Sequence, residues 1–306
     1  MAYRLDARQS ARTSVLAAIH GQLEGAIESL SVTDPDERPA AIHDARKRLK
    51  KARSALRMVR GSVGKATARR LNDELRAIAA TLSDRRDADV LVETVDALHE
   101  RSPGQVPAAT FAALRDRLAQ QAATAGADDD NADQIVRLEA VREQLGEADF
   151  SRVRWKSVGM GIDRAYRRGR KGYKGALYAS TEELHQWRKR AKDLWYHHRL
   201  IKDANPSVVA AFAKDAHQLS DLLGDDHDLA VVRATIVHQD PPAATAPVDL
   251  DPVVDLIDAR RADLQAQARE LARRLYAESP KAFSRRTRTY LHAFTDDAAA
   301  RESVTA

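Results

Sequence analysis

Residues 43–50 read HDARKRLK, and 142 positions later residues 185–192 read HQWRKRAK, with five of the eight letters identical. A second block, LSDRRD at residues 82–87, has a counterpart in LGDDHD at residues 223–228. In each half of the chain, the basic block is followed about 40 residues later by Leu-x-Asp-x-x-Asp. Two related blocks in the same order indicate an internal duplication, so the sequence predicts two homologous halves.

The composition favours helices over strands throughout the chain. Among 306 residues there are 13 glycines and 10 prolines, and aromatic residues make up 5%. Turns and strand-forming side chains are therefore scarce, whereas good helix formers are abundant. We expect helices at about 7–30, 41–60, 65–82, 86–101, 108–124, 134–147, 151–169, 181–203, 207–223, 227–238, 252–277 and 281–299. The sequence predicts an all-α fold with two pseudo-symmetric helical bundles, residues 7–147 and 151–300, in a single domain spanning 1–306.

Several structural and functional classes are excluded by residue content. The chain has no cysteine, so disulfides, thiolate metal sites and a cysteine nucleophile are ruled out. No apolar run approaches the ~18 residues that a membrane span needs. We therefore expect a cytoplasmic protein with no membrane partner. The polar stretch 126–133 predicts a mid-chain loop, and Gly169, Gly172 and Gly175 predict a basic loop between helices.

The positive charge is concentrated in three segments. Residues 42–60, 164–174 and 184–202 contain 20 of the 50 Lys and Arg residues but only two acidic residues, Asp44 and Asp193. These segments carry a formal charge of +18, while the rest of the chain carries −13. Such a segregation of charge predicts that these segments bind a polyanion.

On a helical wheel, each basic block places its cations on one face and apolar residues on the opposite face. The first stripe consists of His43, Arg46, Lys47, Lys50, Arg53, Ser54 and Arg57, and the second of His185, Arg188, Lys189, Lys192, Tyr196 and Arg199. The predicted core faces are Ile42, Ala45, Leu49, Ala52, Leu56 and Val59, and Leu184, Trp187, Ala191, Leu194 and Ile201. An ordinary solvated face mixes both signs of charge. These stripes contain no acidic residue, so their like charges repel unless an anion compensates them.

A repeating phosphate chain suits the stripes better than a nucleic acid does. Arginine presents a planar fork to phosphate oxygens, and lysine adds point charge. The stripes lack the Asn, Gln and Ser mixture with which helices read bases in duplex DNA. Binders of single strands need aromatic stacking platforms, and only Trp195 and Tyr196 lie near the second stripe. Nucleic-acid binding remains the less favoured alternative.

The basic blocks, residues 82–90 and 223–230, and the stretch YRRGR at residues 166–170 together resemble the CHAD domain, the conserved histidine α-helical domain. The resemblance covers about residues 7–300. It implies that long basic helices line a central cavity that binds inorganic polyphosphate, and that the protein associates with polyphosphate granules. Together with the stripes, it predicts polyphosphate contacts from His43, Arg46, Lys47, Lys50, Lys51, Arg53, Arg57, Arg167, Arg170, His185, Arg188, Lys189, Lys192, Tyr196 and Arg199.

The chain also departs from the family pattern. Some CHAD proteins are fused to a triphosphate-tunnel domain, but no β-rich segment is present here, so we expect a stand-alone copy. Asp193 and Trp195 occupy positions that are often basic in the family, and Lys50 and Lys51 replace arginine. We therefore expect weaker binding at the C-terminal end of the second stripe.

The histidines that begin the stripes admit two interpretations. His43 and His185 either contact phosphate or are bonded to the backbone as structural residues. If they contact phosphate, binding should strengthen as the pH falls from about 8 to 6, since an imidazole ordinarily titrates near 6.5. We expect His197 and His198, which lie off the stripe, to be core or edge residues.

The aspartate pairs Asp84/Asp87 and Asp225/Asp228 are the best candidates for chemistry. Asp-x-x-Asp on a helix places two carboxylates on one face, where they could hold Mg²⁺ in a metal-dependent phosphohydrolase. We favour a structural role, in which they cap helices or pair with the basic helices. The DDxxD spacing of isoprenyl-diphosphate synthases and a Walker A loop are both absent. We expect no catalytic residue, no metal and no cofactor.

Overall fold

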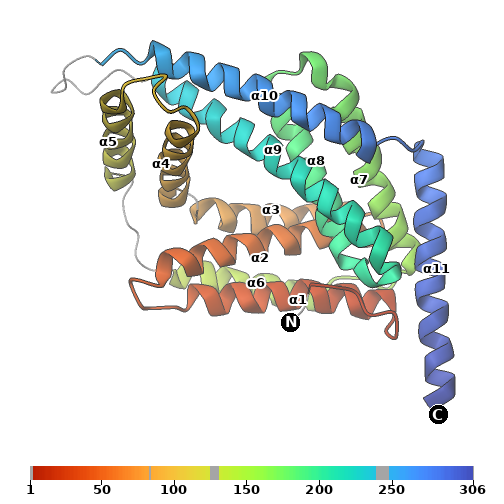
Figure 1. Cartoon of the computed structure of the whole chain (residues 1–306). Coiled ribbons are helices and arrows are strands. Elements are labelled where there is room, and N and C mark those ends of the chain that lie inside the picture. Colours follow the sequence, from red (N-terminus) through yellow and green to blue (C-terminus); the bar gives the residue numbers. More distant parts are fainter. Residues whose placement is uncertain (1–2, 83, 125–130, 239–247, 306) are drawn as a thin grey trace.

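The computed structural model describes residues 3–82, 84–124, 131–238 and 248–305. Within these residues there are eleven α-helices, two short 3₁₀ turns and no strand, which confirms the predicted all-α class (Figure 1). The elements are α1 (Ala11–Leu30), α2 (Arg38–Val59), α3 (Lys65–Thr81), α4 (Asp84–Arg101), α5 (Ala108–Thr124), α6 (Ala132–Glu147), α7 (Trp155–Gly175), η1 (Ala176–Tyr178), α8 (Thr181–Leu200), η2 (Lys202–Ala204), α9 (Pro206–His238), α10 (Asp251–Leu275) and α11 (Pro280–Thr305). No described helix is long and apolar enough to cross a membrane.

Local sequence signals fix where the basic helices begin and which face they bury. Ser180 accepts a hydrogen bond from the Glu183 N–H, and the Glu183 carboxylate accepts from the Ser180 N–H, so a capping box starts α8. In α2, a proline at the second helical position is compatible with helix initiation. The predicted core faces of both helices are buried, apart from Ile42, which is half-buried.

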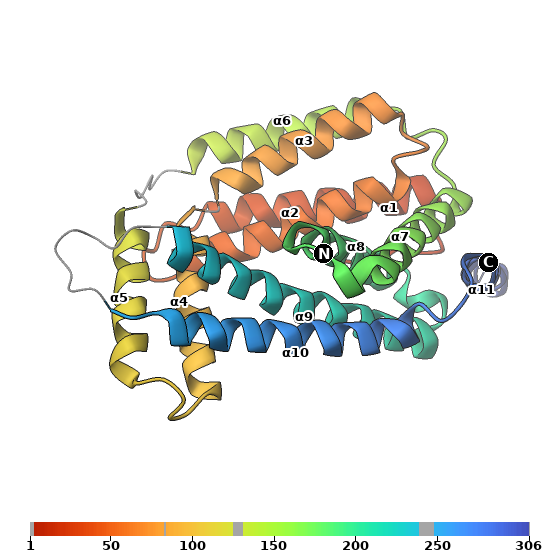
Figure 2. The same ribbon diagram turned by 90° about the horizontal axis from the view of Figure 1, so that it is seen from above.

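The helices pack in neighbouring pairs, and the two basic helices meet. α1 packs on α2, α7 on α8 and α9 on α10, while α3 and α6 pack together beside α1 and α2 (Figures 1 and 2). α4 and α5 lie at one end of the molecule, where α4 contacts α9, and α11 lies against α7 at the other end. α2 also contacts both α7 and α8. This arrangement brings together all three basic segments, which are far apart in sequence.

The hydrophobic core is shared between the two predicted halves. The main cluster joins residues such as Leu49 of α2 and Leu71 of α3 to Leu194 of α8 and Leu219 of α9. A smaller cluster joins α4 and α5 to α9 and α10. Both clusters therefore contain residues from each side of the predicted division near residues 147–151.

The prediction of two helices at 207–223 and 227–238 is wrong, because α9 is one continuous helix through LGDDHD. Gly224 marks a close approach rather than a break. A Cβ at this position would lie 3.2 Å from an Nη atom of Arg188 on the adjacent helix α8. The glycine thus allows the arginine side chain to lie against the α9 backbone.

The predicted glycine-rich loop after residue 169 is also wrong, since α7 continues to Gly175. A Cβ at Gly172 would lie 2.6 Å from the Trp187 ring, and a Cβ at Gly169 would overlap Tyr276. Both glycines accommodate large aromatic rings that pack against the helix. Most of the predicted loop at 126–133 lies outside the described residues, and α6 begins within its end, at Ala132.

Candidate functional site: a cationic track on crossing helices

The two predicted stripes meet where α2 crosses α8. The Ser54 hydroxyl donates a hydrogen bond to Asp193 Oδ1 over 3.2 Å. His197 Nε2 donates to the carbonyl oxygen of Ser54 over 3.1 Å. The crossing therefore joins the C-terminal half of the first basic helix to that of the second.

Asp193 forms the centre of this crossing. It is 7% exposed and forms an ion pair with Arg57 of α2, while Arg190 Nη1 lies 3.7 Å from its Oδ2. Burial alone would raise the pKa of Asp193, but Arg57 and the other nearby cations outweigh burial and lower it. The departure from the family pattern at this position therefore supplies a counter-charge to the first stripe rather than simply weakening the second.

Cations from α2, α7 and α8 surround the crossing, and they affect the pKa values of their neighbours. We define the cationic track as Lys47, Lys51, Arg53, Arg57, Arg60, Arg164, Arg168, Arg188, Lys189, Arg190, Lys192 and Arg199. Burial, Arg188 and Lys47 lower the pKa of Lys192, against opposing effects of Asp221 and Asp228. Burial and Arg199 lower the pKa of Lys51. Cations of the two stripes therefore lie close enough across the crossing to repel one another.

The same repulsion extends to the far end of α2 and to α7. Burial and the neighbouring Arg57 and Arg76 lower the pKa of Arg53 to about 10. The pKa values of Arg60 and Arg164 are lowered by burial and by mutual repulsion that includes Arg168. A bound anion would relieve both effects, because it offers charge compensation to groups that have lost part of their hydration.

Eight of the fifteen predicted contact residues lie in the cationic track: Lys47, Lys51, Arg53, Arg57, Arg188, Lys189, Lys192 and Arg199. His43, Arg46 and Lys50 lie on the same helix α2, the first two half-buried and Lys50 exposed. Arg167 is exposed on α7. Arg170 instead donates a hydrogen bond from Nε to the carbonyl oxygen of Tyr276 over 3.1 Å, which ties it to the end of α10.

Tyr196 was predicted to contact the ligand, but it is only 4% exposed. Its ring stacks on Trp195 with centroids 4.5 Å apart and meets the edge of Tyr3 at 6.1 Å. Burial raises the pKa of Tyr196 to about 12. Its side chain is buried against these aromatic neighbours, so Tyr196 belongs to the core.

Four members of the track were not among the predicted contacts: Arg60, Arg164, Arg168 and Arg190. The motif YRRGR drew attention to Arg167 and Arg170, whereas the helical register places Arg164 and Arg168 together. The signal was the i, i+4 spacing of these two arginines, which puts them on one face of a helix. Their place in the track depends on the packing of α7 on α2, which the spacing does not show.

His185 connects the second stripe to the LGDDHD block. Its ring stacks on His227 of α9 with centroids 4.0 Å apart. Burial, His227 and the nearby Lys189 and Arg188 lower the pKa of His185 to about 4. The imidazole is therefore neutral at pH 7 without ligand, and it takes up a proton on binding if a nearby phosphate raises its pKa.

The aspartates of LGDDHD differ from one another in environment. Asp226 is 1% exposed and accepts hydrogen bonds from Arg261 over 3.1 Å and Gln265 over 2.8 Å, which makes it structural. Burial and the nearby Asp228 and Asp221 raise the pKa of Asp225. The charge of Asp228 opposes part of the lowering of the Lys192 pKa, so Asp228 lies near the second stripe.

The aspartate pairs that could have held Mg²⁺ do not form a metal site in the part of the chain that the structure describes. The side chains of Asp84 and Asp87 lie outside the part of the chain that the structure describes. Asp225 and Asp228 line a cavity of about 270 Å³ together with Glu93, Arg101 and Arg260. No group of three or more His, Asp or Glu residues among the described side chains is placed to hold a metal ion.

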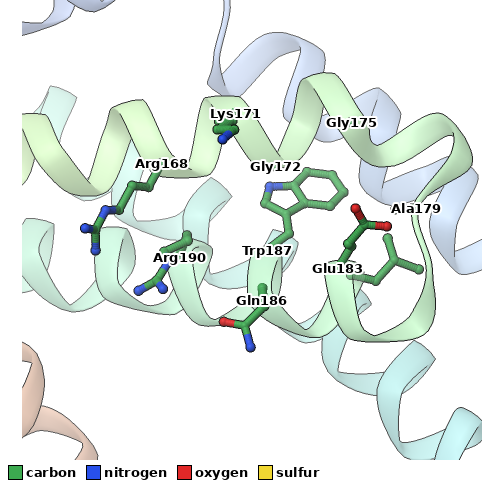
Figure 3. A pocket seen from close by; sticks show the side chains of 10 residues that line it. Arg168, Lys171, Gly172, Gly175, Ala179, Glu183, Gln186, Trp187 and Arg190 are labelled. Carbon is green, nitrogen blue, oxygen red and sulfur yellow. The ribbon is translucent and has the colours of Figure 1, made fainter.

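A cavity of about 370 Å³ lies between α7 and α8, beside the track. The side chains of Arg168, Lys171 and Arg190 contribute its positive charge, and Trp187 lies against the α7 backbone at Gly172. Figure 3 shows the guanidinium groups of Arg168 and Arg190 extending in the same direction from the two helices. This cavity therefore borders the cationic track where α7 packs on α8.

An all-α protein in which two basic helices cross over a buried aspartate, with a third basic helix beside them, is the class that this fold and site define. Residues 15–237 match the CHAD domain, and the chain belongs to that family. Two uncharacterized proteins, from two strains of Mycobacterium tuberculosis, are each 29% identical to it over 271 residues. The alignment covers 82% of this chain and 51% of each relative, so the chain spans about half their length.

Proposed function

We propose that this protein binds inorganic polyphosphate along the cationic track. The observation that carries the proposal is the meeting of two acid-poor basic helices whose cations lower one another's pKa values across the crossing. The folded protein holds these like charges together at a cost in free energy. A polyanion that spans the crossing offsets this cost and releases counterions from its own phosphates.

A chain without bases fits the track better than a nucleic acid. The aromatic residues near the second stripe are engaged in packing: Trp187 is 2% and Tyr196 is 4% exposed. Trp195 is half-buried, and its ring contacts both Tyr196 and His217. Base stacking needs exposed aromatic faces. The positive groups, by contrast, need only closely spaced phosphate oxygens.

We also propose that the two halves arose by duplication and that their basic helices meet about a pseudo-twofold crossing. Helix starts recur 143 or 144 residues later in three pairs: α1 and α7, α2 and α8, and α5 and α10. Arg57 and Asp193 form an ion pair across the crossing. Their equivalents 142 residues away are Arg199 and Lys51, which are also close, since Arg199 lowers the pKa of Lys51. The match supports a central binding surface built from both halves, as the family resemblance implies.

The proposed activity is binding without turnover, in the cytoplasm and on polyphosphate granules. Cleavage of a phosphoanhydride needs a positioned nucleophile and normally a metal. The environment of Asp226 supports a structural role, since its carboxylate bonds to Arg261 and Gln265. The rival metal-dependent phosphohydrolase would use Asp225 and Asp228. Phosphate release that requires Mg²⁺ and disappears in Asp228→Ala would favour this rival.

A paired titration tests the proposed function. Long-chain polyphosphate and single-stranded DNA of equal charge are each titrated into the protein at about 50 and 200 mM salt, a range over which electrostatic affinity falls steeply. We expect tighter binding of polyphosphate than of DNA at both salt concentrations. Equal or tighter binding of DNA would contradict the proposal and favour a nucleic-acid-binding protein.

A further inference from the structure

A second basic cavity lies where α3 meets α2 and α7. It has a volume of about 510 Å³ and is lined by cations from three helices. These are Arg57 and Arg60 at the end of α2, Lys65 and Arg69 of α3, and Arg164 of α7. Among the described residues that line it there is no carboxylate. Lys65 and Arg69 belong to neither stripe, so this cavity extends the positive surface onto a helix that the charge pattern of the sequence did not indicate.

The start of α3 adds backbone donors to these cations. Lys65 and Ala68 in the first turn of the helix line the cavity. Gly64, at the N-cap, has φ of 91° and offers no side chain to bond the first N–H groups. The unsatisfied N–H groups and the helix dipole favour an anion at this end of a helix.

Hydrogen bonds hold several of the lining groups in place before any ligand binds. Asn72 Oδ1 accepts from Arg57 Nη1 over 3.2 Å, and Asp193 pairs with the same guanidinium. Arg164 Nη2 donates to the carbonyl oxygen of Met58 over 2.7 Å. Groups fixed in this way lose little conformational freedom on binding, which favours affinity.

We infer that this cavity, here called the seat, is a binding site for a short linear oligophosphate of a few phosphate groups. The inference rests on the proposed function in that the ligand is a phosphate chain, and Arg57 belongs to both the cavity and the track. A volume of about 510 Å³ lies within the range of small-ligand sites, about 300–1,000 Å³, and suits a compact anion better than an extended polymer. The same chemistry is presented by the end of a long polyphosphate chain and by a free short oligophosphate.

The test compares two double variants by calorimetric titration with tripolyphosphate and, separately, with long-chain polyphosphate. Lys65→Ala with Arg69→Ala removes the α3 cations of the cavity. The matched control is Arg70→Ala with Lys214→Ala, which removes two exposed cations, one on α3 and one on α9. We expect the first variant to lose at least tenfold in tripolyphosphate affinity and less in long-chain affinity, and the control to change both by less than threefold.

A third arm identifies the source of the oligophosphate. If protein that already carries long-chain polyphosphate no longer binds tripolyphosphate, the seat holds the end of the long chain. If the protein binds both ligands at once, the seat holds a free oligophosphate. Unchanged tripolyphosphate affinity in the Lys65 and Arg69 variant would overturn the seat and leave the proposed function intact. Failure of the wild-type protein to bind long-chain polyphosphate, with tripolyphosphate still bound, would overturn the proposed function and leave the seat.

Discussion

Asp193 links the two basic helices through a single carboxylate. Replacement by asparagine keeps the shape but leaves Arg57 and Arg190 without their shared counter-charge. Removing one partner of a buried ion pair typically costs about 3–5 kcal/mol. Because Arg57 is partly exposed, we expect Asp193→Asn to lower the free energy of unfolding by about 3 kcal/mol. Chemical denaturation measures this loss.

The same substitution should strengthen ligand binding. It removes the negative charge that lies beside Arg57 and Arg190, so the track gains positive potential. We expect Asp193→Asn to bind long-chain polyphosphate at least as tightly as the wild type, and bound polyphosphate to restore part of the lost stability. A variant that is both unstable and unable to bind would instead show that Asp193 maintains the whole site.

Two buried histidines make stability depend on pH. Burial lowers the pKa of His197 to about 4 and that of His198 to about 3. In the unfolded chain both titrate near pH ~6.5, so between these values the unfolded state binds more protons. The contribution is therefore complete above pH ~6.5 and is lost as the pH falls towards ~4.

Urea denaturation between pH 7 and 4 measures this effect. We expect the free energy of unfolding to fall by several kcal/mol over this range, since each pKa unit corresponds to about 1.4 kcal/mol. His198 stacks on Phe212 with ring centroids 4.3 Å apart, so His198→Phe retains an aromatic ring and should reduce the pH slope. An unchanged slope would place the titrating groups elsewhere.

At the scale of the elements, glycines in α7 determine how closely its neighbours pack. In an isolated helix, alanine is more stable than glycine by about 1 kcal/mol. At Gly172 the effect should reverse, because a Cβ would lie 2.6 Å from the Trp187 ring. We expect Gly172→Ala to destabilise the protein by about 1–3 kcal/mol, the usual range for overpacking.

Gly146→Ala is the matched control for this prediction. Gly146 lies within α6 and has nothing within 4 Å of the position that a Cβ would take. The alanine there should be neutral or stabilising by up to about 1 kcal/mol. Thermal unfolding of both variants separates the packing effect from helix propensity, and a stabilising Gly172→Ala would contradict the account of α7.

Sequence periodicity predicted the helices whose own residues define a buried face and a charged face. The buried faces of α2 and α8 follow from apolar residues at helical spacing, and the stripes follow from cations at the same spacing. The continuation of α7 and α9 could not be predicted in this way, because Gly172 and Gly224 are determined by rings and guanidinium groups on other helices. The same reason hid Arg164 and Arg168, which join the track only through the packing of α7 on α2.

At the scale of the whole molecule, pairs distant in sequence decide the site. Asp193 and Arg57 are 136 residues apart, and their contact depends on how α2 crosses α8. Tyr196 was placed on the second stripe by the helical wheel, but the N-terminal Tyr3 covers it. A wheel describes one helix in isolation and cannot show which of its faces another segment covers.

The most direct test of the central claim is the equilibrium affinity for long-chain polyphosphate after charge reversal in the track. Lys47→Glu with Lys189→Glu changes one exposed cation on each crossing helix, and Arg70→Glu with Lys214→Glu is the control of equal net charge. At about 150 mM salt, where surface charges more than ~8 Å apart are largely screened, we expect the track variant to lose at least tenfold in affinity. The control should lose less than threefold. Equal losses in the two variants would show that net charge, rather than the track, attracts the polyanion, and would contradict the account.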